Sequence, residues 1–403
     1  MARLTTFSKL LIVFVVVAAA FFGIQYLMGS GLLGDGSSTG GTTTNSTSTS
    51  TSSSAAGDAI RIGVVTWGGY AGGQYFNEGF AASEQSRYSK EYGIDVEFVL
   101  NDDVEASLNA WKAGELDLHW YTIDAFPTIL PGLQAFDPVA LFQADWSRGG
   151  DAIVARRGIN SVADLKGKKI AVAELTPSHS FLIWLLDAGG LSIDDVEVVA
   201  QASAIDAAEA FKSKAVDAAV VWSPDDQQCV RAVTGARILE STRSASNIIA
   251  DFFFAKREYV NANRDKLQKL YEGWMRGAAE INTSPAAKNK AARILSQGQG
   301  IPEADALASI DNVRLVTHGD NLNFFGMNTQ FQGVDGNALY QRMANEYKQL
   351  GVIEGNVANW RQVSMPILVQ NTNLTGDQHT AEASKSFTKV NEEAAKNLEA
   401  IAS

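Results

Sequence analysis

The sequence is poor in cysteine: Cys229 is the only one among 403 residues. One cysteine excludes an intramolecular disulfide framework and any zinc site built from several thiolates. We interpret Cys229 as a small buried hydrophobic residue, and the alternative is a reactive thiol.

Basic residues are also scarce, with 33 Lys and Arg against 45 Asp and Glu and a net charge of −12. Because nucleic-acid binding requires basic patches that neutralise phosphates, we exclude a nucleic-acid partner. Neither an H-E-x-x-H pattern nor a P-loop occurs, so zinc-protease and nucleotide-hydrolase chemistry have no support. We expect no catalytic activity, no cofactor and no metal.

An uncharged apolar run occupies residues 10–28, behind Arg3 and Lys9. As a helix it spans about 28 Å, close to the thickness of a bilayer core. Since the basic residues precede the run, the start of the chain is expected to stay cytoplasmic and the rest to be exported. A cleaved signal peptide is the alternative, but its apolar region is usually shorter and no A-x-A site follows this one. We therefore expect an extracytoplasmic protein, tethered through residues 1–28, or secreted if the run is cleaved.

Residues 29–57 are mainly Gly, Ser and Thr. Such a segment has almost nothing to bury and behaves as a flexible linker. The folded part is therefore predicted to begin at residue 58.

From residue 58 the pattern alternates between apolar strands and amphipathic helices. This alternation is typical of an α/β fold with mainly parallel sheets. A glycine-rich turn, GGYAGG at 68–73, and then a helix into the 80s are expected after the first strand. Strands are predicted at 60–67, 94–100, 138–146, from 151, 169–173 and 196–200, and later helices at 180–188, 263–281, 286–297, 303–311 and 336–350.

Two stretches 100 residues apart repeat the same pattern. SLNAWKAGELDLHWYTIDA at 107–125 aligns without a gap to AAEAFKSKAVDAAVVWSPD at 207–225. Each is a helix, a small-residue turn, a short apolar strand and a polar or aromatic cluster. Ligands of α/β sheets bind beyond the carboxyl ends of strands, so two such units predict two similar lobes that face one cleft.

The chain from about 60 to 365 resembles the periplasmic solute-binding proteins of ABC importers for nitrate, sulfonates, taurine and bicarbonate, and their thiamine-precursor-binding relatives. The resemblance rests on six pieces in the expected order: IRIGVVTWGGY, LNAWKAGELDLHW, SVADLKGKKIAV, SHSFLIWLLDAGGLSIDDVEVV, AAEAFKSKAVDAAVVWSPD and NLNFFGM.

The resemblance implies a two-lobed type II periplasmic-binding-protein fold with two hinge crossovers. Lobe 1 would comprise residues 58–148 and 250–365, lobe 2 residues 149–249, and residues 366–403 a peripheral tail. The hinge strands would lie near 146–151 and 247–252.

Candidate binding residues follow the predicted strand ends and one helix start. Strand-end glycines allow a ligand to approach the backbone, and aromatic rings supply flat walls. A helix N-terminus favours an acidic or carbonyl group. The candidates are Trp67, Gly68, Gly69, Tyr70, Tyr121, Thr122, Asp124, Thr176, Ser178, His179, Trp222, Ser223, Asp225 and Asp251.

Most of these residues also have a structural interpretation. Trp67 is alternatively a core residue, Asp124 and Asp225 alternatively cap the following helices, and Asp251 alternatively supports the hinge. Likewise, the polar residues at 176–179 alternatively serve only as a helix cap. His119 lies inside a strand and is interpreted as a hydrogen-bonded core residue.

No arginine occurs at the predicted strand ends, although bidentate arginine contacts commonly recognise sulfonates and carboxylates. Aromatic rings with carboxylates favour a cationic nitrogen, whereas the helix start favours an acidic group. The residues therefore favour a small zwitterionic or nitrogen-bearing solute, and the resemblance implies an oxyanion or sulfonate.

Three functions remain open at this point. The first is a monomeric binding protein that delivers a small solute to an ABC permease. The second is a tethered solute-sensing receptor or scaffold. The third, an enzyme like the thiamine-pyrimidine synthases, is disfavoured because the resemblance would require a cysteine-rich segment.

Overall fold

The computed structural model describes residues 59–244 and 246–382. The expected anchor, the linker and the tail beyond residue 382 lie outside these residues. In the described part, no helix is long and apolar enough to cross a membrane. The same part holds no cluster of three or more His, Cys, Asp or Glu residues suited to a metal ion.

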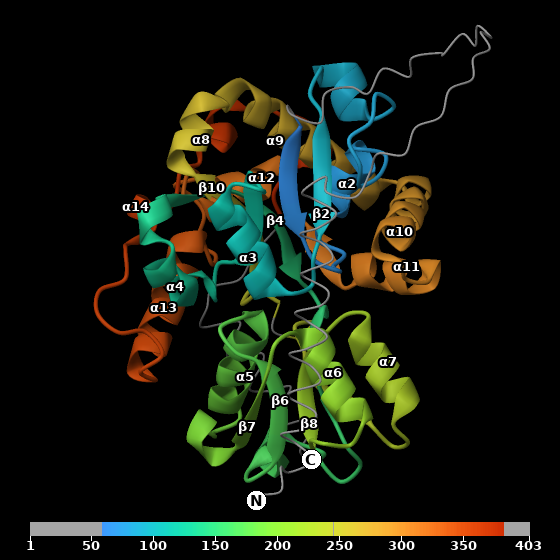
Figure 1. The fold of residues 1–403 in the computed structure, drawn as a ribbon, viewed down its shortest axis with the longest axis vertical. Coiled ribbons are helices and arrows are strands. Elements are labelled where there is room, and N and C mark those ends of the chain that lie inside the picture. Colours follow the sequence, from blue (N-terminus) through green and yellow to red (C-terminus); the bar gives the residue numbers. More distant parts are fainter. Residues whose placement is uncertain (1–58, 245, 383–403) are drawn as a thin grey trace, which may run out of the picture. The chain divides into compact units, whose positions relative to one another are not determined.

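The described strands form two sheets (Figure 1). The six-stranded sheet has the order β11-β4-β10-β3-β1-β2 and the five-stranded sheet the order β7-β6-β8-β5-β9. Their bounds are β1 Ile60–Val64, β2 Val96–Leu100, β3 Leu118–Thr122, β4 Pro138–Ser147, β5 Asp151–Ala155, β6 Lys169–Ala173, β7 Glu197–Gln201, β8 Ala218–Trp222, β9 Arg237–Ser241, β10 Ala250–Lys256 and β11 Val313–Leu315.

Each sheet combines a parallel part with an antiparallel strand at the crossover. Strand β1 pairs in parallel with β2 and β3, and β6 pairs in parallel with β7 and β8. Strand β10 runs antiparallel to β3 and β4, and β5 runs antiparallel to β8 and β9. The chain passes from the first sheet to the second between Ser147 and Asp151, and returns between Ser241 and Ala250. The expected α/β class with two sheets is confirmed, but the expectation of mainly parallel sheets is wrong. Strands β4, β10 and β11 add antiparallel pairs to the first sheet and β5 adds them to the second, so both sheets are mixed.

Helices cover both sheets, and their positions agree with the expected 3.6-residue periodicity. The α-helices are α2 Ala71–Phe76, α3 Val104–Ala113, α4 Phe126–Ile129, α5 Pro177–Ala188, α6 Ala204–Lys212, α7 Asp225–Ala232, α8 Arg257–Ala262, α9 Arg264–Thr283, α10 Pro285–Gln299, α11 Glu303–Asp311, α12 His318–Phe324, α13 Gly336–Gln349, α14 Trp360–Val363 and α15 Ile367–Asn371. Shorter helical turns occur at Tyr88–Tyr92, Leu130–Gly132, Gln134–Phe136, Val162–Leu165, Ile193–Asp195 and Asp377–His379.

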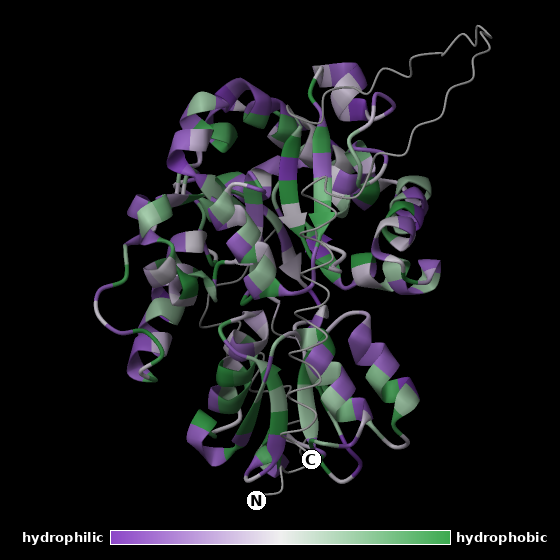
Figure 2. Cartoon of the chain, viewed as in Figure 1, coloured by the Kyte–Doolittle hydropathy of each residue, from purple (hydrophilic) through white to green (hydrophobic). Residues whose placement is uncertain are grey.

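The two sheets have different cores. Aromatic rings dominate around β10, where Phe253 and Phe142 both pack on Trp274. Aliphatic side chains fill the other sheet, for example Val172, Leu185 and Val220. Figure 2 shows hydrophobic residues along β6 and β8, and a largely hydrophilic α7 to the side of this sheet.

The expected helix into the 80s is wrong. Helix α2 begins at Ala71, inside the predicted turn, and ends at Phe76. The Asn77 amide then donates to the carbonyl of Val96 at 3.0 Å and fixes the following loop. Glycines permit this early start, because a Cβ on Gly73 would lie 2.4 Å from the Trp274 ring of α9. These glycines thus allow α2 and α9 to pack closely.

The first part of the expected peripheral tail is packed against the body. Leu368 and Val369 of α15 are fully buried, and residues near 380 contact α12. Sequence patterns within a few residues do not reveal this packing, because it depends on parts of the chain that are far away in the sequence.

Candidate functional site

A small cavity lies between the two sheets. Its walls come from the loop after β1, from β3, β5, α5 and β8, and from the start of β10. The lining residues are Val65, Trp67, Tyr70, Trp120, Asp151, Pro177, Trp222, Ile249 and Asp251. Both sheets and both crossovers therefore contribute to the same cavity.

Aromatic rings from both sheets form much of the wall. The Trp222 ring lies 6.4 Å from that of Trp67 and 5.9 Å from that of Trp120, both in edge-on geometry. Tyr70 lies 6.2 Å from Trp120. The indole Nε1 atoms of Trp120 and Trp222 have no protein hydrogen-bond partner among the described residues, so both donors remain available to a solute.

Buried carboxylates lie beside these rings. Asp251 accepts a hydrogen bond of 2.7 Å from the Tyr70 hydroxyl, and Asp145 accepts one of 3.1 Å from Trp67 Nε1. Asp151 is 1% exposed, and its Oδ2 has no protein hydrogen-bond partner in the described part of the chain. Because charges are rarely buried without a partner, this cluster makes the cavity the candidate functional site.

The acids of this cluster hold their protons more tightly than free carboxyls. Burial, with the charge of Asp151, raises the pKa of Asp145 to about 8. Burial, with the charge of Asp124, raises the pKa of Asp151 to about 7. The pKa of Asp251 is raised well above its ordinary value by burial and then by the charge of Asp145. Desolvation and mutual repulsion thus act in the same direction, and no lysine or arginine lines the cavity to oppose them.

Four of the candidates predicted from the sequence line the cavity: Trp67, Tyr70, Trp222 and Asp251. Gly68 and Gly69 do not. A Cβ on Gly68 would lie 2.3 Å from the carbonyl oxygen of Ser309, and one on Gly69 would overlap the Asp145 carboxylate. These glycines therefore allow other parts of the protein, rather than a ligand, to approach the backbone closely.

Tyr121, Thr122 and Asp124 are buried but do not line the cavity. The Tyr121 hydroxyl donates to the carbonyl of Leu175 at 2.6 Å and so joins the two sheets. Neither carboxylate oxygen of Asp124 has a protein hydrogen-bond partner among the described residues, and burial raises its pKa to about 7. The alternative interpretation of Asp124 as a helix cap is not met, since α4 has no side-chain cap.

The start of α5 matches the capping interpretation. The Thr176 hydroxyl accepts a hydrogen bond from the backbone N–H of Ser178 at 3.2 Å. The N–H groups of His179 and Ser180 both bond to the carbonyl of Thr176, and Pro177 has no N–H. His179 accepts a hydrogen bond from the Leu175 N–H at 3.3 Å and packs edge-on against Tyr347. The first N–H groups of α5 are therefore committed, and the Ser178 hydroxyl, which has no hydrogen-bond partner among the described residues, is the donor left at this helix end for an anion.

Ser223 and Asp225 lie outside the lining. The Ser223 hydroxyl accepts a hydrogen bond of 3.0 Å from the Asn312 amide and thereby links the sheets. Asp225 opens α7 without a side-chain cap, and burial raises its pKa to about 6. His119, as expected, is a core residue, bonded to Ser107 at 2.9 Å.

The sequence analysis missed Trp120, Asp145 and Asp151. Trp120 precedes Tyr121 in the same strand, and alternation alone does not say which of the two faces the cleft. Asp145 and Asp151 flank the first crossover within an apolar run. Acidic residues in a strand that is otherwise buried are the signal that could have identified them.

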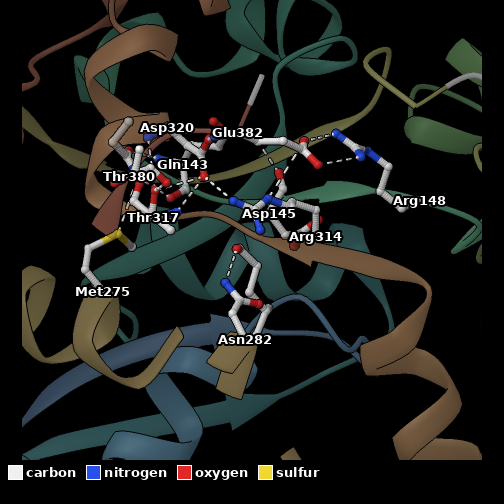
Figure 3. A network of polar contacts seen from close by, with 12 residues as sticks. Gln143, Asp145, Arg148, Met275, Asn282, Arg314, Thr317, Asp320, Thr380 and Glu382 are labelled. Carbon is white, nitrogen blue, oxygen red and sulfur yellow. Dashed lines mark hydrogen bonds and ion pairs between the residues drawn. The ribbon is translucent and has the colours of Figure 1, made fainter. Parts of the chain in front are cut away.

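A polar network holds β4 from behind the cavity (Figure 3). The backbone of Gln143 exchanges two hydrogen bonds with the Asn321 side chain, at 2.8 and 3.1 Å. Arg148, at the first crossover, pairs with Glu382 at 2.6 Å, and the Glu382 N–H donates to Asp320 at 2.7 Å. This network fixes the strand that carries Asp145.

The model of the family described as NMT1/THI5 like matches residues 77–288, more than half of the chain. The chain belongs to the NMT1/THI5-like family. A family relative from Brucella abortus, named as a binding protein, is 34% identical over 191 residues. That alignment covers 47% of this chain and 58% of the relative, so it spans less than two thirds of the relative's length.

Solved structures share the fold of this family member. The periplasmic aliphatic sulphonate-binding protein SsuA of Escherichia coli has a TM-score of 0.59 at 21% identity, covering 78% of this chain and 99% of SsuA. The periplasmic nitrate-binding protein NrtA of Synechocystis has a TM-score of 0.63 at 14% identity, covering 85% and 98%. The desulfurization enzyme DSZB also matches, at 16% identity and a TM-score of 0.54, covering 78% and 98%. At these identities the likeness concerns the fold alone.

Proposed function

We propose that this protein is the extracytoplasmic solute-binding component of an ABC importer and that it captures a small solute between two lobes. The observation that carries the proposal is the cavity, whose walls come from both sheets and both crossovers. Concave sites of mixed apolar and polar lining are the usual form of small-molecule sites. The sulphonate-binding and nitrate-binding neighbours are periplasmic proteins on the same fold.

The lobes of the proposal are residues 58–148 with 250–365, and residues 149–249. Hydrogen bonds cross between them, including Tyr121 to Leu175 at 2.6 Å and Asn312 to Ser223 at 3.0 Å. Such contacts exist only when the lobes are close. A solute that contacts both walls would favour the closed arrangement, which a permease can distinguish from the open one.

The remaining parts of the proposal come from the sequence. Residues 10–28 would tether a monomer to the membrane, and residues 29–57 would let the lobes reach a permease. A catalytic thiol has no support, because Cys229 is buried on α7, away from the cavity, and burial raises its pKa to about 12. We therefore propose binding without catalysis.

Thermal unfolding of the purified full chain tests the proposal. The panel comprises nitrate, bicarbonate, taurine, alkyl sulfonates, betaines, polyamines, amino acids and thiamine precursors. A solute at 100 times its dissociation constant adds about 2.7 kcal/mol to the stability of the folded state, so one chemical class should raise the melting temperature clearly.

A matched pair of variants locates the effect. Trp222→Leu should abolish the stabilisation, whereas Trp360→Leu should retain it, because Trp360 is similarly buried but lies on α14 outside the cavity. The proposal is wrong if no solute stabilises the chain, or if both variants respond as the unsubstituted protein does.

A further inference from the structure

The chemistry of the cavity wall indicates which charge its solute carries. Three tryptophans and a tyrosine supply ring faces, and Asp151 and Asp251 supply carboxylates. Asp145 lies directly behind, hydrogen-bonded to Trp67. This inference rests on the proposed function, because it concerns the same cavity.

The carboxylates lack a cation from the protein. No lysine or arginine lines the cavity, and the charges that act on Asp251 come from Asp145, Asp151 and Asp124. Asp151 is almost fully buried and has an oxygen without a protein partner in the described residues. Because burial and mutual repulsion oppose the charged forms of these acids and raise their pKa values, a positively charged solute would favour the charged forms by supplying the missing counter-charge.

The aromatic walls favour the same charge. The face of an indole ring carries negative potential and attracts ammonium groups, with tryptophan the strongest of the side chains. Trp222 meets Trp67 and Trp120 edge-on, at interplanar angles of 70° and 89°. The plane of the Trp222 ring is steeply inclined to both neighbours, so the three rings line the cavity in different orientations.

An oxyanion would find few partners in the same space. The first N–H groups of α5 are committed to Thr176, and Pro177, which lines the cavity, has none. Trp67 Nε1 donates to Asp145. The indole N–H groups of Trp120 and Trp222 remain, and they suit an uncharged acceptor elsewhere on the solute.

We propose that the cavity binds an organic ammonium ion, with its charged nitrogen among Trp67, Trp120 and Trp222 and paired with Asp151 and Asp251. This assignment separates the chain from the sulphonate-binding and nitrate-binding proteins that share its fold.

Isothermal titration calorimetry of the full chain tests the charge directly. The two probes are choline and 3,3-dimethyl-1-butanol, which has the same shape with carbon in place of the ammonium nitrogen. Choline should bind at least about tenfold more tightly than the neutral analogue, because only choline gains cation–π and ion-pair attraction. Methanesulfonate and nitrate serve as anionic probes and should show no binding.

Substitutions identify the carboxylates responsible. Asp151→Asn and Asp251→Asn keep the size of the side chain and remove its charge, so each should weaken choline binding about tenfold or more and leave the neutral analogue unchanged. Asp226→Asn is the control, because Asp226 is equally buried but lies on α7 outside the cavity lining. Melting temperatures of all three variants establish that they are folded.

The outcomes distinguish this inference from the proposed function. Binding of methanesulfonate or nitrate without choline would overturn the cation assignment and leave solute binding intact. Equal binding of choline and its neutral analogue, or no effect of either carboxylate, would also overturn it. Failure of every solute, including the wider panel above, would overturn both.

Discussion

The two repeated units of this chain have the same framework but different functional ends. Helix α3 starts after Asp103 and α6 after Ser203, residues 100 positions apart that both cap their helix through a side-chain oxygen. Asp117 accepts a hydrogen bond from the Arg61 N–H at 2.8 Å, and Asp217 accepts one from the Lys169 N–H at 3.0 Å. The gapless alignment therefore corresponds to equivalent contacts.

A second equivalence concerns the aromatic residue of each helix. Trp111 and Phe211 are both fully buried. The Lys256 amine lies 5.5 Å from the centre of the Trp111 ring, and the Arg156 guanidinium lies 5.1 Å from that of Phe211. Lys256 is the last residue of β10 and Arg156 directly follows β5, the antiparallel strand beside each unit. Lys256 also donates a hydrogen bond to a backbone carbonyl of α3, and Arg156 donates one to a backbone carbonyl of α6.

The difference begins at the strand ends. Trp120 lines the cavity from β3, whereas Trp222 lines it from β8, two residues further along the alignment. A shift of two residues keeps a side chain on the same face of a strand. Both units therefore place a tryptophan on the same face of their strand, at positions that differ by two residues.

The largest effect is expected from the paired core residues. Trp111→Ala and Phe211→Ala should each lower the free energy of unfolding by about 3–5 kcal/mol, because both leave a large cavity in a packed core. Urea unfolding of the full chain measures this. A loss below about 1 kcal/mol in one variant alone would break the equivalence of the units.

The next effect concerns the acids beyond the two strands and depends on pH. Burial raises the pKa of Asp124 to about 7 and that of Asp225 to about 6, against about 3.9 in an unfolded chain. The folded state therefore binds more protons at these two acids, so their contribution to stability is fully present below about pH 4 and is lost as pH rises to about 7.

Asp124→Asn should reduce the loss of unfolding free energy between low and neutral pH by about 1 kcal/mol or more. Asp225→Asn should reduce it by less, because Asp124 is the more deeply buried of the two. Urea unfolding at pH 4.5 and pH 7.5 provides the comparison. An equal pH dependence in the unsubstituted chain and in Asp124→Asn would refute the assignment.

The smallest effect concerns the turn between helix and strand. Gly114 has φ 81° in the first unit, and Lys214 has φ 69° at the equivalent position in the second. Since a side chain is strained in this left-handed region, Lys214→Gly should stabilise the chain by up to about 1 kcal/mol. Gly114→Lys should destabilise it by a similar amount. Melting temperatures compare the two, and the same sign in both variants would contradict the equivalence.

Local patterns predicted the strand and helix positions well, because alternation and capping act within a few residues. The limits of β6 and α11 agree residue for residue with the expectation. Helix α2 was misplaced, because glycines 72 and 73 serve contacts with α9, which lies 200 residues away. Within the site, Trp67 and Asp251 were found from their positions, whereas Asp145 and Asp151 depended on tertiary burial that a single sequence does not show.

The central claim is that both units hold one solute, and paired calorimetric titrations test it most directly. Choline is titrated into the full chain and into Trp120→Leu, Trp222→Leu and the control Trp360→Leu. The account predicts that Trp120→Leu and Trp222→Leu each weaken choline binding about tenfold or more, while Trp360→Leu leaves it unchanged. Unaltered affinity in either Trp120→Leu or Trp222→Leu would show that the solute does not lie between the two units.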